Sequence, residues 1–350
     1  MTPTATRFVA MGDPQAPFST VLSVLRTHGL LGADDRLVSD VHLVSMGDHF
    51  DWGQRAARSE ATRDGVTTLL WLSSHPPEQV TLLLGNHDLA RVGELAGFDD
   101  ETFMLAQLEA EAAYRLGDVD DAAERAFLVS FPSVPDAECL ARDYGCFSVA
   151  QRDLVTALIR TRRFRLAASF FGVLLVHAGV TVPDLALIGL DPGASAVDLA
   201  AGLNAFLDAR IDAWSTGPLN LDPFHRLGSA TSGEGKGAVY HRPFDPTLSA
   251  GHKGPPPRRR FDPRELPVAL TQVIGHIRDG KCRELMPKWC DPVEAGDGIR
   301  SLRVLGEVVE YRAGLQSMPQ LIFIDAGMNH LAPEAYPLFD LSTHRPLAKP

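Results

Sequence analysis

The chain has 350 residues, of which 45% are hydrophobic and 22% charged, so it has enough apolar side chains for a sizeable buried core. Its formal net charge of −11 disfavours broad binding to nucleic acid or to anionic membranes. The charge does not exclude a phosphorylated substrate, because bound cations can reverse the local field of a site.

Six short apolar runs recur along the chain, and each ends in a compact polar or glycine-containing cluster. Short runs bounded by turn residues are typical of strands that are buried on both faces. Polar residues that follow such strands gather at one edge of an α/β sheet, where ligand sites lie. The runs are Arg7–Met11 before GDPQ, Val41–Met46 before GDHFD, Val80–Leu84 before GNHD, Gly172–Val176 before HAG, Gln272–Ile274 before GH and Leu321–Ile324 before DAG.

Helical patterns lie between these runs. Gln54–Ser74 and Asp191–Trp214 each predict a helix, the first ending at His75-Pro76-Pro77. Residues 101–163 predict two or three helices, broken near Phe131-Pro132 and Tyr144-Gly145. We interpret residues 95–165 as a helical insertion or cap, with sheet-covering helices as the alternative. The Gly- and Pro-rich stretch 228–263 predicts loops.

The polar clusters contain the residue types that hydrolysis of a phosphate ester requires. The reaction needs a strong nucleophile at neutral pH and neutralisation of charge on the phosphoryl oxygens, and two bound metals supply both. The protein then provides a bridging carboxylate, further oxygen and nitrogen ligands, and an acid for the leaving group. Taken singly, these residues are also compatible with turns, helix caps or core histidines. The candidates are Asp13, Gln15, Asp48, Asn86, His87, His177 and His276.

In order along the chain, these motifs resemble those of the calcineurin-like metallophosphoesterases. The branch indicated is the phosphoprotein phosphatase group, including the bacterial Shewanella-like phosphatases, whose signatures are GDxHG, GDxxDRG, GNHE, HGG and GH. The matching segments here are GDPQ, GDHFDWG, GNHD, HAG and GH, and the resemblance runs from about Gly12 to Gly327, nearly the whole chain. The resemblance implies an αββα sandwich, that is, two mixed sheets flanked by helices, within a single domain over residues 1–350.

The resemblance also implies a role for each matching residue. Asp13 and Gln15 would bind the first metal and Asp48 would bridge both metals. The second metal would be completed by Asn86, which would also contact phosphate, by His177 and by His276. His87 would be the general acid or contact the phosphoryl oxygen, oriented by Asp51. Neutral imidazoles and bridging carboxylates are chemically suited to these tasks.

Two positions depart from the family pattern. Gln15 stands where most of the family has histidine, and its harder amide oxygen favours Mn²⁺ or Mg²⁺ over Zn²⁺. Trp52 replaces the arginine of the DRG signature, which holds substrate phosphate in the phosphatases. Arg55 is a substitute if this loop runs into a helix, and stacking of Trp52 on the substrate is an alternative.

Further segments contain polar residues that are candidates for a role at the site. Residues 238–242 resemble a WYR-type segment of the same group, which makes Arg242 a candidate phosphate ligand, with a surface arginine as the alternative. We interpret Asp325 as structural support, and we leave His49 and His225 without a role. The basic run Arg258-Arg259-Arg260 is typical of a solvated loop, with a substrate contact as the alternative.

The sequence therefore predicts a metal-dependent phosphatase, a hydrolase that uses a metal-bridging hydroxide for in-line attack on phosphomonoesters. Two alternatives stay open: hydrolysis of dinucleoside polyphosphates or phosphodiesters, and a degenerate phosphate-binding or interaction protein. We expect two divalent metals, with Mn²⁺ favoured over Fe, Zn or Mg, and a phosphorylated small molecule, nucleotide or phosphoprotein as substrate. We expect neither general nucleic-acid binding nor membrane association. The four cysteines lack CxxC spacing and the N-terminus lacks a secretory pattern, so we expect reduced thiols and a cytoplasmic location.

Overall fold

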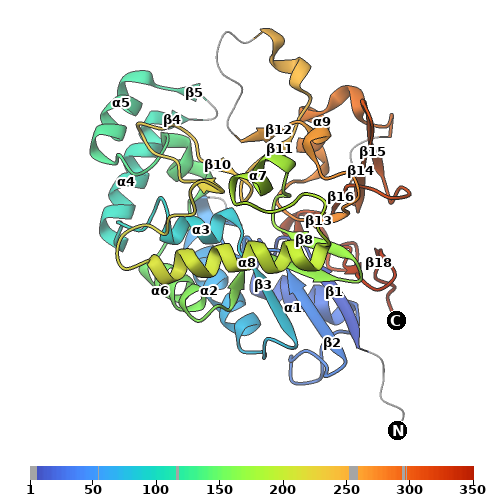
Figure 1. Cartoon of the computed structure of the whole chain (residues 1–350). Coiled ribbons are helices and arrows are strands. Elements are labelled where there is room, and N and C mark those ends of the chain that lie inside the picture. Colours follow the sequence, from blue (N-terminus) through green and yellow to red (C-terminus); the bar gives the residue numbers. More distant parts are fainter. Residues whose placement is uncertain (1–5, 54, 116–117, 252–258, 294–295, 297) are drawn as a thin grey trace.

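Two mixed, six-stranded sheets form the centre of the protein (Figure 1). The computed structural model describes residues 6–350 apart from 54, 116–117, 252–258, 294–295 and 297. The first sheet has the order β18-β17-β1-β2-β3-β6 and the second β15-β14-β16-β13-β8-β7. The first contains β1 (Arg7–Met11), β2 (Val41–Ser45), β3 (Val80–Leu83), β6 (Phe164–Arg165), β17 (Phe339–Asp340) and β18 (Arg345–Pro346). The second contains β7 (Ala167–Phe170), β8 (Val173–Val176), β13 (Gln272–Ile274), β14 (Arg300–Leu305), β15 (Val308–Ala313) and β16 (Leu321–Phe323).

All six strands predicted from apolar runs are present. β1 and β13 have the predicted bounds, and the other four differ by one residue. β1, β2 and β3 are parallel to one another, as are β8, β13 and β16. The strands that the sequence did not predict lie mainly towards the sheet edges, where half-exposed residues such as those of β15 weaken the apolar pattern.

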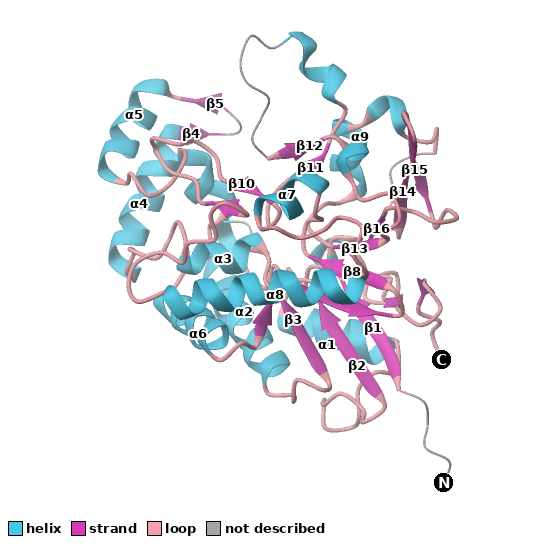
Figure 2. Cartoon of the chain, in the orientation of Figure 1, coloured by secondary structure: helices cyan, strands magenta, loops and turns pink. Residues whose placement is uncertain are grey.

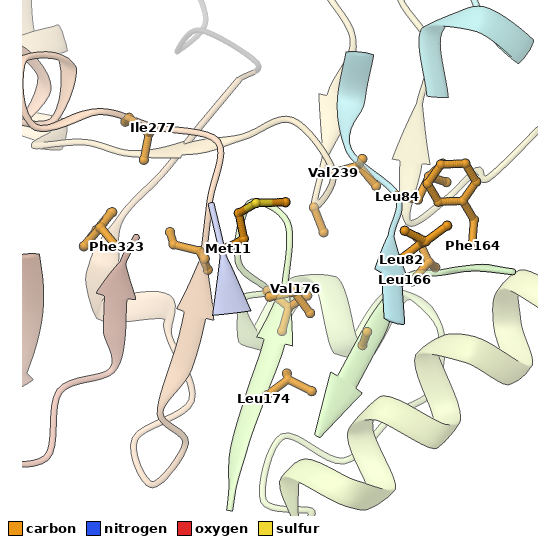
Figure 3. Packing of buried hydrophobic residues seen from close by; sticks show 14 of the residues in the cluster. Met11, Leu82, Leu84, Phe164, Leu166, Leu174, Val176, Val239, Ile277 and Phe323 are labelled. Carbon is orange, nitrogen blue, oxygen red and sulfur yellow. The ribbon is translucent and has the colours of Figure 1, made fainter. Parts of the chain in front are cut away.

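Apolar side chains fill the space between the two sheets. One buried cluster contains Ala10, Val44 and Leu83 from the first sheet together with Leu175, Val273 and Ile322 from the second, and it includes no helical residue. The opposite strand faces pack against helices in a larger cluster, part of which is seen in Figure 3. Alternation along the strands thus makes one central and two outer apolar layers, which confirms the predicted αββα sandwich.

Helices cover both outer faces (Figure 2). α8 packs against β7 and β8, and α1, α2 and α6 cover the other sheet. Their buried residues recur at helical spacing, for example Leu199, Leu203 and Leu207 in α8. The bounds are α1 (Phe18–Thr27), η1 (Arg55–Ala57), α2 (Arg58–Ser73), α3 (Asn86–Val92), α6 (Val149–Arg160), α7 (Val182–Leu187), α8 (Ala196–Ala213) and α9 (Asp279–Leu285). The predicted start of the first long helix, Gln54, lies outside the described residues.

The segment predicted as an insertion divides into two parts. α4 (Asp100–Ala113), the hairpin of β4 (Tyr114–Arg115) and β5 (Asp118–Val119), α5 (Asp121–Ser130) and the π-helix η2 (Cys139–Asp143) lie to one side of the sheets (Figure 1). They pack around an apolar cluster in which Phe103 and Phe127 are buried and to which Ala90 of α3 and Tyr240 also contribute. α6, in contrast, packs on α2 and α3 as a sheet-covering helix. We call residues 99–147 the cap.

Loops and short elements complete the chain. β9 (His225–Arg226) lies just before the predicted loop region. That region contains the two-residue strands β10 (Lys236–Gly237), β11 (Arg242–Pro243) and β12 (Arg260–Phe261) and the 3-10 turn η3 (Pro246–Gly251), and the 3-10 turn η4 (Pro263–Glu265) begins at its last residue. Two more turns follow, η5 (Pro287–Trp289) and η6 (Met328–His330). Within the described residues, none of the helices is long and apolar enough to cross a membrane. All four cysteines are free, as expected.

The layer between the sheets predicts a stability effect. Leu175 is fully buried there, so Leu175→Ala should lower the free energy of unfolding by about 2–5 kcal/mol through lost apolar burial and a residual cavity. Urea unfolding monitored by circular dichroism measures this change. Leu305→Ala, at a strand position that is 54% exposed, is the matched control. Equal effects of the two substitutions would contradict the assigned layer.

Candidate metal centre and active site

The polar residues predicted from the motifs meet at the carboxyl ends of the parallel strands. Asp48 follows β2, His177 follows β8 and His276 follows β13. One ligand atom from each of these three side chains lies within 4.8 Å of the others, and all three residues are buried. Strands from both sheets therefore bring distant segments of the chain together in one buried cluster.

The proton positions on His177 fit a bound cation. Met46 O accepts from Nδ1 at 2.7 Å, so in the neutral imidazole Nε2 carries the lone pair. Nε2 faces Asp48 Oδ2 at 3.3 Å and Asn86 Oδ1 at 3.1 Å. A lone pair and two acceptor oxygens that face one another are stabilised by a cation between them. In the metal-free protein burial lowers the pKa of His177, but the Asp48 carboxylate outweighs burial and raises it. A proton on Nε2 is then favoured in place of the cation.

His276 is also prepared as a neutral ligand. Its Nε2 donates to Tyr240 O at 3.0 Å, which leaves the lone pair on Nδ1. Burial, then the charges of Arg242 and His177, lower its pKa well below the ordinary value. The imidazole therefore stays neutral, the form in which histidine binds metals.

Backbone shape brings Asp48 into the cluster. Asp48 and His276 adopt left-handed conformations, with φ of 56° and 66°, which are uncommon outside glycine. A Cβ on Gly85 would lie 2.2 Å from Asp48 Oδ1, and one on Gly275 would lie 2.1 Å from Asp13 Oδ1. The glycines of GNHD and GH are therefore needed so that the backbone can approach these two carboxylates.

Asp13 lies beside this cluster with excess negative charge around it. Both of its carboxylate oxygens accept from His276 N, at 2.9 and 3.1 Å. Burial, then the charges of Asp325 and Asp48, raise the pKa of Asp13 well above its ordinary value. Burial likewise raises the pKa of Asp325 to about 6. The hydroxyl of nearby Tyr336 is buried and has no hydrogen-bond partner within the described ranges of the chain. A cation would relieve this concentration of carboxylates, so the residues fit a metal here.

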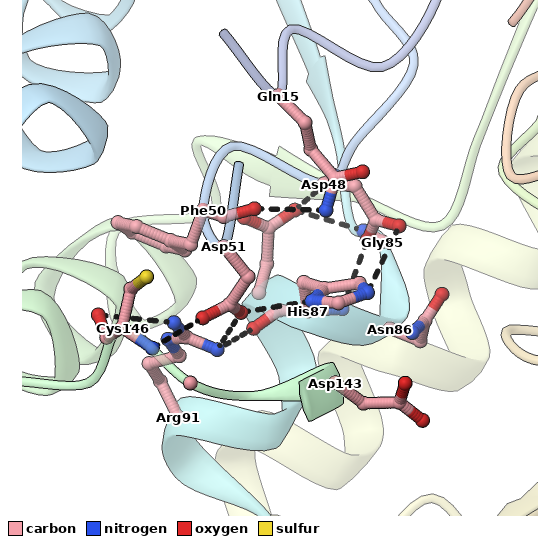
Figure 4. A network of polar contacts seen from close by, with 12 residues as sticks. Gln15, Asp48, Phe50, Asp51, Gly85, Asn86, His87, Arg91, Asp143 and Cys146 are labelled. Atoms are coloured by element: carbon pink, nitrogen blue, oxygen red, sulfur yellow. Dashed lines mark hydrogen bonds and ion pairs between the residues drawn. The ribbon is translucent and has the colours of Figure 1, made fainter. Parts of the chain in front are cut away.

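Gln15 lies beside Asp48 in the same region (Figure 4). Its amide nitrogen donates to Phe50 O at 2.8 Å, which leaves the amide oxygen available as an acceptor. Gln15 and Asp13 both line the cavity described below. This placement is compatible with the predicted ligand role of Gln15.

His87 and Asp51 form the predicted acid–carboxylate pair. His87 Nδ1 lies 2.8 Å from Asp51 Oδ2, and Nε2 lies 3.9 Å from Asp48 Oδ2. Burial lowers the pKa of His87, but Asp48 and Asp51 outweigh burial and raise it above the ordinary value. Burial opposes ionisation of Asp51, yet Arg91 and His87 bring its pKa down to about 2. In the metal-free protein both shifts therefore favour a protonated imidazole against an ionised carboxylate.

Asp88 organises the two loops that carry these residues. Its carboxylate accepts from Asp48 N at 2.9 Å, Gly85 N at 3.0 Å and His49 Nδ1 at 2.9 Å. His49 Nε2 contacts Ser45 Oγ at 2.9 Å. His49, to which the sequence assigned no role, therefore helps to hold the loop after β2 in place through its contacts with Asp88 and Ser45.

The candidate phosphate ligand Arg242 lies close to the metal cluster. It is half-buried, and its charge is the second cause of the lowered pKa of His276. Its Nε is buried and has no hydrogen-bond partner among the described residues. The prediction of a solvated basic run is wrong for Arg259 and Arg260, which are half-buried at β12 because each packs on an aromatic ring, of Tyr240 and Phe244. Arg258 lies outside the described residues.

A cavity of about 1190 Å³ opens from the carboxylates towards the cap. Trp52 and Arg55 line it from the loop after β2, Leu108 and Glu111 line it from α4, and Arg278 lines it beside Asp325. The sequence indicated Arg55 in place of the DRG arginine on the condition that this loop continues into a helix. That condition is met, because η1 begins at Arg55 and α2 follows it. However, Arg55 Nη2 pairs with Glu111 at 3.1 Å, on the cap side of the cavity.

Several residues of the site carried no recognised signal in the sequence. Asp88 adjoins His87 in the GNHD motif and was identifiable from that position. Asp325 followed a predicted strand, yet its proximity to Asp13 depends on the pairing of β16 with β13. Arg91 and Tyr144 had no such signal. His225 lies outside the metal cluster, and burial and His241 lower its pKa to about 3.

Comparison with known proteins relates part of the chain to phosphatases. No protein-family model matches it. Over 99 residues, 28% of this chain, it is 31% identical to the serine/threonine-protein phosphatase 6 catalytic subunit of Caenorhabditis elegans. The match spans 26% of that relative, about a quarter of its length. The chain is thus a distant relative of the phosphoprotein phosphatases, the group indicated by its motifs.

Two solved structures align with most of the chain at low identity. One is a cold-active protein tyrosine phosphatase, with a TM-score of 0.44, 15% identity and coverage of 96% of this chain and 73% of that one. The other, from a psychrophilic Shewanella species, has a TM-score of 0.45, 15% identity and coverage of 98% and 77%. The fold of this chain is defined by its two six-stranded sheets and their strand order.

The cluster predicts that divalent metal stabilises the fold. Mn²⁺ at one hundred times its dissociation constant should add about 2.7 kcal/mol to the free energy of unfolding. Asp48→Asn should remove most of this gain because the cluster loses its central charge. Differential scanning calorimetry with and without Mn²⁺ measures both, with Asp153→Asn on exposed α6 surface as the control. An undiminished Mn²⁺ effect in Asp48→Asn would contradict the assignment.

Proposed function

We propose that this protein is a metal-dependent phosphoesterase that hydrolyses phosphomonoesters. The observation that carries the proposal is the convergence of Asp48, His177 and His276 on one point, with His87 beside them. In each histidine one ring nitrogen is bonded to a backbone carbonyl, which leaves the other free to bind a metal, and the free nitrogen of His177 faces Asp48 Oδ2. The distant relation to phosphatases supports the same reaction class.

In this proposal, two divalent metals bind at adjacent positions. Asp13, Gln15 and Asp48 would hold the first, and Asp48, Asn86, His177 and His276 would hold the second. When bound, the metals would supply a nucleophile at neutral pH and neutralise charge on the phosphoryl group. Oxygen donors predominate at the first position, so we propose Mn²⁺ there, with Mg²⁺ as the other hard cation suited to it.

The chain's own groups would orient the ester and protonate the leaving group. Arg242 is half-buried, and its Nε has no hydrogen-bond partner in the part of the chain that the structure describes. It would contact the phosphoryl oxygens. Water would add to phosphorus as the bond to the leaving oxygen breaks. His87 would give its Nε2 proton to that oxygen, because Nδ1 stays bonded to Asp51. In the metal-free protein burial lowers the pKa of His87, and Asp48 and the Asp51 hydrogen bond raise it; once Asp48 holds metal, the Asp51 hydrogen bond is the contact that would favour the protonated imidazole.

The volume of the cavity indicates how large a leaving group would fit. At about 1190 Å³ it exceeds the usual range of small-molecule pockets, so the space beyond a phosphoryl group would accommodate a bulky alcohol. This observation favours a second candidate, a dinucleoside polyphosphate or phosphodiester hydrolase, whose leaving group is a nucleotide or nucleoside. Both candidates use the same metal and acid groups.

Activity should depend on metal and on His87. Purified protein with Mn²⁺ should release phosphate from 4-nitrophenyl phosphate, and chelation should abolish the release. His87→Gln should lower kcat by about 10²- to 10⁴-fold while metal content, measured by mass spectrometry, is unchanged. Asp153→Asn is the control.

A parallel screen distinguishes the candidates. Preferential turnover of dinucleoside polyphosphates or of bis(4-nitrophenyl) phosphate would favour the second. Turnover of no phosphate ester with any divalent metal would favour the phosphate-binding protein.

Arg242 should contribute to phosphate binding. Arg242→Met should raise KM for 4-nitrophenyl phosphate about tenfold or more, because a charge-assisted contact to phosphate is lost. Steady-state kinetics and inhibition by inorganic phosphate measure this effect. Arg226→Met removes an arginine that is 62% exposed and serves as the control. Unchanged phosphate inhibition in Arg242→Met would exclude the contact.

A further inference from the structure

The segment that leaves the π-helix η2 lies directly behind His87. The π-turn closes with Tyr144 N donating to Cys139 O at 2.7 Å. The Tyr144 ring then meets the His87 imidazole edge-on, with centroids 5.1 Å apart and planes at 87°. Both residues are largely buried, so this is a packed contact. π-turns are rare and are often found at functional sites.

The same segment holds the carboxylate that binds His87. Cys146 N donates to Asp51 Oδ1 at 2.8 Å, from 95 positions along the chain. The other carboxylate oxygen, Oδ2, contacts His87 Nδ1 at 2.8 Å and Arg91 Nη1 at 2.6 Å (Figure 4). Both oxygens of Asp51 are therefore occupied, and the carboxylate cannot rotate without breaking a contact.

Arg91 ties these parts together from a fully buried position. It donates from Nη1 to His87 O at 3.0 Å and from Nε to Gln151 Oε1 at 3.1 Å, at the start of α6. Its guanidinium also lies 4.7 Å from the centre of the Phe50 ring. Strand ends, cap and α6 thus meet at one buried cation.

We propose that Tyr144 and Arg91 are positioning residues for His87. Through Tyr144 the cap then helps to orient the general acid as well as to line the cavity. The proposal rests on the function proposed above. A single hydrogen bond at Nδ1 leaves the imidazole free to rock about that bond. Tyr144 closes one side of the ring, and the Arg91–Asp51 pair fixes the hydrogen-bonded end. Together they hold Nε2 on the side of Asp48. Small displacements of an acid from a reacting atom are costly in rate.

Leaving-group dependence tests the proposal. A displaced acid slows poor leaving groups most, because good ones depart without a proton. Tyr144→Leu should lower kcat for phenyl phosphate about ten- to one-hundredfold and change that for 2,4-dinitrophenyl phosphate little, with KM unchanged. Tyr144→Phe keeps the ring and should behave as the wild type. Arg91→Lys keeps the charge but loses the planar guanidinium with its several N–H donors. It should lower kcat for phenyl phosphate by less than Tyr144→Leu does, again with little change for 2,4-dinitrophenyl phosphate.

Phe147→Leu is the matched control for damage to the cap. Phe147 is a buried cap aromatic that packs on Phe103, with centroids 4.9 Å apart. Its substitution should leave the dependence on leaving group unchanged. An equal loss on both substrates in Tyr144→Leu, or the same pattern in Phe147→Leu, would overturn the proposal.

A measurement on the metal-free protein separates this inference from the proposed function. Protein labelled with ¹⁵N and ¹³C in histidine gives ring signals for His87, assigned by their absence in His87→Gln. Tyr144→Leu should shift the His87 ring protons by loss of the ring current and should broaden them, whereas Tyr144→Phe and Phe147→Leu should not. If these shifts occur in a protein that hydrolyses no phosphate ester, the positioning stands and the function fails. Unchanged His87 signals in Tyr144→Leu would overturn the positioning even in an active enzyme.

Discussion

The rest of the site depends on the burial of ionised Asp48 between two histidines. An isolated buried carboxylate is costly, and here His177 and His87 offset that cost enough to lower the pKa of Asp48. The three groups come from separate strand ends, so the charge is compensated only when both sheets are in register. The same arrangement that makes a strong ligand set therefore also constrains the fold, because a shift of one strand would leave a charge buried without its partner.

Close backbone approach makes this compensation geometrically possible. The loops after β2 and β13 place Asp48 and His276 in left-handed conformations. Gly85 and Gly275 leave room against the Asp48 and Asp13 carboxylates. Such strained and crowded positions are retained where the surrounding structure determines them, as the Asp88 hydrogen bonds to Asp48 and Gly85 do here. Local strain at the strand ends is thus offset by a buried network.

The cap connects to this centre on two sides. On one side, Leu108 and Glu111 of α4 line the cavity opposite the carboxylates, with Arg55 paired to Glu111. On the other, Cys146 N reaches Asp51, which holds His87. Substrate space and proton position therefore share one structural unit. Loops and insertions that shape a cavity are expected to vary with substrate, whereas groups that orient an acid are under tighter geometric constraint.

The sequence by itself determined the strands and the residue types at their ends. Continuous apolar runs such as β1 and β13 leave a clear pattern because both strand faces are buried, and the polar cluster after each run identified Asp48, His177 and His276. Tertiary structure alone decided that Arg91 and Tyr144 contact the predicted pair of Asp51 and His87. Arg91 meets Asp51 and Gln151, and Tyr144 meets His87, through contacts that span up to 60 positions. Periodicity records only the burial of a residue relative to its neighbours in the chain. Contacts between distant residues depend on sheet order and cap packing, and a single sequence carries no local signal for either.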